Sequence, residues 1–70
     1  MDFEAELEKR DARGRLEVWK SLAPFLSAGE LKTVMARAAR GEDLTAIHRD
    51  MGLMNRYQVE MIRILGRTGP

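Results

Sequence analysis

Four adjacent residues in the second half of the sequence form a segment rich in side chains that recognise base edges in DNA. They are Asn55, Arg56, Tyr57 and Gln58. Arginine can donate two hydrogen bonds to guanine, and asparagine or glutamine can pair in a similar way with adenine. Glu60 follows closely and could accept a hydrogen bond from cytosine. Such side chains read a sequence when they begin a helix that enters the major groove, so this segment predicts a recognition helix.

Basic residues around this segment are candidates for contacts with phosphate groups, because lysine and arginine supply most of the attraction between a protein and DNA. The candidates are Lys32, Arg37, Arg40, Arg49 and Arg63. The alternative for Arg56, Glu60 and Arg63 is a solvent-exposed helix face with ion pairs three and four residues apart. Asn55 and Gln58 also have a structural alternative as a capping pair at the start of the same helix.

The first third of the chain predicts helices that could form a dimer contact. Asp2 can cap a first helix. Apolar residues then recur three and four positions apart over residues 12–23, which is typical of a buried helical stripe. They are Ala12, Leu16, Trp19, Leu22 and Ala23. Phe3 and Leu7 lie off this stripe, so we expect the first dozen residues to form a separate or frayed turn. Pro24 should end the helix, since the residue before proline avoids helical geometry.

A strong start signal marks the next helix. Ser27 and Glu30 have the spacing of a capping box, in which each side chain bonds the backbone N–H of the other residue. Gly41 is placed to take the left-handed conformation that often follows a helix. One face of this helix is expected to be buried, and its apolar residues are Leu31, Val34, Met35 and Ala38.

Two further helices are predicted in the last third. Asp43 can cap the first of them, and Gly52 can end it. The second is expected to open near Asn55 and to close at Gly66. The expected buried residues are Leu44, Ile47 and Met51 in the first, and Tyr57, Met61, Ile62, Ile64 and Leu65 in the second. About three residues around Gly52 would separate the two helices, which is the spacing of a helix-turn-helix unit.

The predicted fold class is therefore all-α, with no segment that alternates like a strand. We expect one small four-helix domain over residues 1–70, with a helix-turn-helix in its C-terminal half. Residues 1–24 would form an N-terminal helical segment, residues 27–66 the helix-turn-helix core, and residues 67–70 a flexible tail.

The spacing of the helix-capping residues and glycines also resembles that of a known protein family. The residues concerned are Ser27, Glu30, Gly41, Ile47 and Gly52. In this register, residues 27–65 resemble the DNA-binding domain of LuxR-type regulators and, more loosely, the last region of sigma factors. The resemblance implies that residues 55–60 begin the recognition helix and that Thr45 and Arg49 face the DNA backbone. The leading prediction is a small, dimeric transcriptional regulator that binds DNA, with the Trp19 helix as the dimer contact.

The same span leaves a protein-binding function open. Val59 lies seven residues after Gly52, one more than in those regulators, and His48 stands where they have a small residue. The net charge is only +1, which is low for a chain held on DNA by charge. The alternative is an antiactivator or anti-sigma-like module that binds a transcription factor or sigma factor and does not bind DNA. Its expected interface residues are Trp19, Leu22, Met54 and Tyr57.

Composition argues against several other classes of protein. The chain has no cysteine and one histidine, so a thiolate or histidine zinc site and a disulfide are excluded. No nucleophile lies beside a base and no glycine-rich phosphate loop occurs, so we expect neither an enzyme nor a cofactor. No apolar run approaches the ~20 residues that span a bilayer. The acidic N-terminus lacks the apolar core of a signal peptide, so a cytoplasmic protein without membrane contact is expected.

Overall fold

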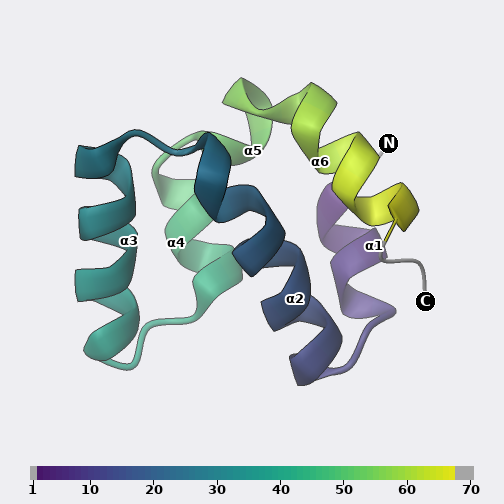
Figure 1. Cartoon of the computed structure of the whole chain (residues 1–70). Coiled ribbons are helices and arrows are strands. Elements are labelled where there is room, and N and C mark those ends of the chain that lie inside the picture. Colours follow the sequence, from purple (N-terminus) through teal and green to yellow (C-terminus); the bar gives the residue numbers. More distant parts are fainter. Residues whose placement is uncertain (1, 68–70) are drawn as a thin grey trace.

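Helices account for all regular structure in residues 2–67, the part of the chain that the computed structural model describes (Figure 1). In chain order they are α1 (Phe3–Glu8), α2 (Ala12–Leu22), the 3-10 helix η1 (Ala23–Phe25), α3 (Ala28–Ala39), α4 (Leu44–Asp50), α5 (Leu53–Arg56) and α6 (Gln58–Arg67). The predicted all-α class is confirmed. The described residues form six α-helices and not the predicted four, because each terminal segment divides into two helices.

The first dozen residues form a true helix that belongs to the core. The Asp2 side chain accepts hydrogen bonds from two backbone N–H groups at the start of α1, and the Asp11 side chain accepts one, from Gly14, at the start of α2. Phe3 and Leu7 point from α1 into the main hydrophobic cluster. The expectation of a separate turn missed this role, because a short helix can be held by tertiary packing when its own length does not suffice.

The buried face of α2 differs from the predicted stripe. Val18, Trp19 and Leu22 are buried, whereas Leu16 is 40% exposed. The apolar spacing is therefore right for a helix, but the face is rotated, because α2 packs on α6. The helix ends at Leu22, and Pro24 lies in η1, as the geometry around proline requires.

The cap of α3 is confirmed. The backbone N–H of Ser27 donates to Glu30 Oε1 at 2.9 Å, and the backbone N–H of Glu30 donates to Ser27 Oγ at 3.2 Å. Gly41 follows the helix with a φ of +92°, in the conformation that favours glycine. Of the predicted face only Val34 is fully buried, and Met35 is 63% exposed. The prediction for Met35 was wrong because α3 packs mainly on α4, on one side only.

The connection after α4 is shorter than predicted, and the helix after it is broken. Asp43 caps α4, and Gly52 ends it with a φ of +70°. Helix α5 begins directly after Gly52, so Asn55 lies inside α5 and does not cap the next helix. Tyr57, with φ −110° and ψ 35°, separates α5 from α6. The predicted Asn55–Gln58 capping pair is therefore wrong.

The last described helix continues to Arg67, so Gly66 does not end it. Met61, Ile64 and Leu65 of α6 are buried, as expected. Ile62 is 44% exposed, contrary to the prediction. The rest of the predicted tail, residues 68–70, lies outside the described residues.

The hydrophobic core joins the two ends of the chain. Leu7, Leu22 and Met61 belong to one cluster, which holds α1, α2 and α6 together. Val34, Ile47 and Leu53 form a second cluster among α3, α4 and α5. In Figure 1, α3 and α6 accordingly lie on opposite sides of the molecule, with α4 and α2 between them. None of the helices in residues 2–67 is long and apolar enough to cross a lipid bilayer.

Candidate interaction surface

The predicted base contacts do not share one helix. Asn55 and Arg56 are exposed on α5, whereas Glu60 and Arg63 lie on α6, beyond the break at Tyr57. Helix α6 packs chiefly on α2, and α4 packs on α3 and α5. The helix that comes after α4 and packs on it is therefore the four-residue α5. It carries only two of the predicted base contacts, Asn55 and Arg56.

Arg56 is engaged within the chain. It forms an ion pair with Glu30 of α3 and lies over the Tyr57 ring, 5.3 Å from the ring centroid. The Tyr57 hydroxyl donates to Glu30 Oε1 at 3.0 Å. The hydrogen bond from the Ser27 backbone, followed by those from Tyr57 and Ser27 Oγ, holds the pKa of Glu30 below its ordinary value. Glu30 thus caps α3 and ties it to α5 at the same time.

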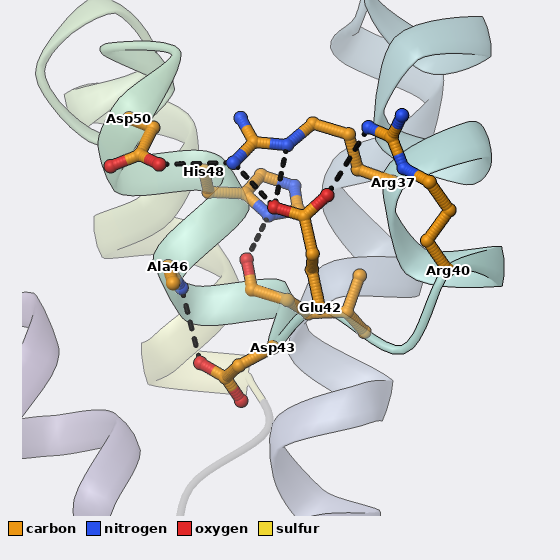
Figure 2. A network of polar contacts seen from close by, with 8 residues as sticks. Arg37, Arg40, Glu42, Asp43, Ala46, His48 and Asp50 are labelled. Carbon is orange, nitrogen blue, oxygen red and sulfur yellow. Dashed lines mark hydrogen bonds and ion pairs between the residues drawn. The ribbon is translucent and has the colours of Figure 1, made fainter.

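Two basic residues at the C-terminal end of α3, Arg37 within the helix and Arg40 directly after it, are tied to the turn that follows (Figure 2). Arg37 Nη2 donates to Glu42 Oε1 at 2.6 Å and to Asp50 Oδ2 at 3.0 Å. Arg40 Nη2 donates to Glu42 Oε2 at 3.2 Å. The hydrogen bond from Arg37 lowers the pKa of Glu42, which keeps this carboxylate charged. The network closes the α3–α4 turn and leaves little free positive charge on it.

Arg49 of α4 reaches the N-terminal helix. Its guanidinium forms an ion pair with Glu4 of α1, and this contact raises the pKa of Arg49. Thr45, one turn earlier on α4, is half-buried. The two residues line a polar hollow together with three acids, Glu4, Glu8 and Asp43, and one further base, Arg15, so acids outnumber bases there. Carboxylates around Thr45 and Arg49 oppose the approach of a phosphate group.

Most of the predicted phosphate contacts are therefore neutralised internally. Of six predicted basic contacts, four form ion pairs with carboxylates of the chain, namely Arg37, Arg40, Arg49 and Arg56. Lys32 and Arg63 take part in no ion pair within residues 2–67.

The predicted protein interface is largely inside the molecule. Trp19, Leu22 and Met54 are exposed by only 4%, 0% and 8%, because they pack into the main cluster. Little of these three side chains is available to a partner in this conformation. The predicted dimer through the Trp19 helix stays a prediction. Tyr57 is half-buried, with its hydroxyl directed to Glu30.

His48 fills the contact between α2 and α4. Its ring stacks on Trp19 with a centroid distance of 4.0 Å and an interplanar angle of 14°. His48 Nδ1 lies 2.7 Å from the carbonyl oxygen of Leu44. Because that oxygen can only accept, Nδ1 is the donor. Burial lowers the pKa of His48, so the neutral ring is favoured.

The structure presents a different apolar surface, on α6 and η1. Phe25, Val59 and Ile62 are exposed by 43%, 57% and 44%. A hollow of about 350 Å³ is lined by Phe25, Glu60, Ile62, Arg63, Gly66 and Arg67. These six residues and Val59 are called the α6–η1 face below. Exposed apolar side chains that gather beside charged ones are typical of protein contact sites.

Sequence reasoning missed this face, although the helical geometry contains the signal. At about 100° per residue, the buried side of α6 is set by Met61, Ile64 and Leu65. Val59 and Ile62 fall outside that arc, so α6 has a second apolar side. Grouping Ile62 with the buried residues concealed it.

Comparisons of the chain with protein-family models, with characterised proteins and with solved structures gave no match. The chemistry and geometry of the described surface therefore carry the functional inference.

Proposed function

We propose that this chain is a regulator that acts by binding another protein through the α6–η1 face. The observation that carries this proposal is the exposure of Phe25, Val59 and Ile62 beside Arg63 and Arg67. Neither arginine forms an ion pair within residues 2–67. The resemblance of residues 27–65 to transcription regulators suggests a transcription factor or sigma factor as the partner.

The internal ion pairs favour a protein partner over DNA. An exposed ion pair stabilises a fold by only about 0–1 kcal/mol, so an arginine could leave its carboxylate for a phosphate. The carboxylate would then remain close to the phosphate and repel it. Glu4, Glu30, Glu42 and Asp50 stand in this position beside Arg49, Arg56 and Arg37.

The arrangement of the last helices supports the same proposal. A recognition helix projects its N-terminal residues into the major groove while the helix before it braces the backbone. Here α6 packs on α2, and only the short α5 packs directly on α4. The exposed side chains of α6 therefore lie away from α4, on the largely apolar α6–η1 face.

DNA binding is the second candidate function, and one hollow favours it. Asn55, Gln58 and Arg49 line this hollow next to Gly52, which gathers two amides and a guanidinium of the kinds that read bases. Asp2 and Glu4 line the same hollow. Their negative charge weighs against phosphate at that position.

Titration of the chain with fluorescent DNA from its own upstream region separates the two functions. We expect no sequence-selective binding at about 50 mM salt, the condition that most favours phosphate contacts over the range to about 200 mM. Selective binding that weakens steeply with salt, and that Asn55→Ala removes, would overturn the proposal in favour of DNA binding. Lys20→Ala serves as the control for general loss of positive charge, since Lys20 is exposed on α2 and is not among the predicted DNA contacts.

A further inference from the structure

We infer that the partner of the α6–η1 face is an amphipathic helix with apolar anchors and carboxylates along one flank. This inference rests on the proposed function, since it names the chemistry of the partner at the same site. It follows from the shape of the hollow, from the charge beside it and from the bare backbone at Gly66.

The hollow is suited to an inserted apolar side chain. Phe25 of η1 and Ile62 of α6 line it, and its volume is about 350 Å³. Val59 lies three residues before Ile62 and continues the apolar surface along α6. A helix that lies in such a groove inserts side chains three or four residues apart.

The charge beside the hollow selects carboxylates. Arg63 and Arg67 are four residues apart and therefore lie next to each other on the helix surface. Within the described part of the chain neither has an acidic partner at ion-pair distance. Carboxylates one turn apart on a partner helix would match this spacing. Among the described residues that line the hollow, Glu60 is the one acid and Arg63 and Arg67 are the two bases, so their charges sum to one positive charge.

Gly66 leaves the surface of α6 open to close approach. A Cβ atom at this position would meet nothing within 4 Å among residues 2–67, so packing within that part of the chain does not require glycine here. Glycine inside a helix is less favourable than alanine by roughly 0.5–1 kcal/mol. Its presence is explained if a partner backbone lies against α6 at this point.

Two other occupants fit the face less well. A second copy related by a two-fold axis through the middle of α6 would bring Arg63 close to its own counterpart, and like charges repel. A membrane surface would be flat and negative, whereas this face is hollowed and carries Glu60 on its lining.

The test uses the full chain and two synthetic helical peptides with the same leucine stripe. One peptide carries glutamate along the flank of the stripe, and the other carries lysine. Anisotropy of the labelled peptides gives the affinity, and backbone amide NMR shifts give the location. We expect the glutamate peptide to bind about tenfold more tightly than the lysine peptide, since two ion pairs replace two repulsions. The shifted amides should be those of residues 59–67 and Phe25.

Four variants make the test specific. Arg63→Glu should reverse the preference between the two peptides, and Arg63→Gln should reduce it. Lys32→Glu is the matched control, because Lys32 is also exposed and in no ion pair of the described chain, but lies on α3; it should leave both affinities unchanged. Gly66→Ala should weaken the binding of the glutamate peptide while the chain stays folded.

Several outcomes would overturn the inference. Equal affinity for both peptides would show that Arg63 and Arg67 do not select carboxylates. Amide shifts confined to α3 would show that the peptides do not bind the α6–η1 face. Loss of a self-associated dimer in Arg63→Glu, measured by sedimentation, would identify a second copy as the occupant. Binding to vesicles of anionic lipid that Arg63→Glu abolishes would identify a membrane. If a cellular protein still contacts the face through Ile62 in these cases, the proposed function stands and only the acidic partner is wrong.

Discussion

Some single residues in this chain contact two helices at once, and His48 is the clearest case. It stacks on Trp19 of α2 and bonds its own helix through Nδ1. A stacked aromatic pair contributes about 0.5–1.5 kcal/mol beyond the area that it buries. Protonation would place a charge in this buried contact, so the stability of the fold depends on the state of one ring.

The prediction at this scale concerns pH. The pKa of His48 in the folded chain lies below its ordinary value of 6.5, so the unfolded chain binds more protons as the pH falls. Stabilisation by the neutral ring is complete above pH 6.5 and is lost as the pH drops toward the lowered pKa. We expect His48→Phe, which keeps a ring against Trp19, to lose less stability than the wild type between about pH 7 and 5.

Thermal unfolding followed by circular dichroism measures this difference. Below that range the carboxylates with lowered pKa, such as Glu42, should destabilise both proteins alike as they become protonated. Equal loss of stability in the wild type and His48→Phe between about pH 7 and 5 would show that His48 does not titrate on unfolding.

At the scale of the secondary-structure element, helix α6 places its apolar residues on two different sides. It has one apolar side in the core and a second in solvent. Met61→Ala should destabilise the chain by about 2–5 kcal/mol, because it leaves a cavity in the main cluster. Ile62→Ala should change the free energy of unfolding by no more than about 0.5 kcal/mol, because Ile62 lies on the surface and outside the two core clusters. Chemical denaturation of the Met61→Ala and Ile62→Ala variants tests which side of α6 is in the core. Similar losses of unfolding free energy in both variants would contradict this placement.

Local signals predicted the ends of the first helices well, but they failed at Asn55 and Gly66 in the last third and on several buried faces. The caps at Asp2, Ser27 and Asp43 and the positive φ of Gly41 and Gly52 follow from interactions within a few residues. The exposure of Leu16, Met35 and Ile62 depends on which helices pack together, and an apolar spacing alone does not specify the partner. The break at Tyr57 likewise had no local marker in the sequence.

At the scale of the whole molecule, the candidate site depended on contacts between distant segments. Glu4 and Arg49 are 45 residues apart in sequence, and Glu30 and Arg56 are 26 apart. Neither ion pair can be read from spacing, yet each removes a basic residue from the predicted DNA surface. The α6–η1 face is where exposed apolar side chains and arginines outside the described ion pairs lie together.

The measurement that tests this account most directly is photo-crosslinking in the cell of origin. A photoreactive amino acid replaces Ile62 in one version of the chain and Met35 in the other. Both residues are exposed and apolar, but Met35 lies on α3, away from the α6–η1 face. The account predicts a discrete protein adduct from position 62 that is absent from position 35. The same adducts from both positions, or adducts to DNA alone, would contradict it.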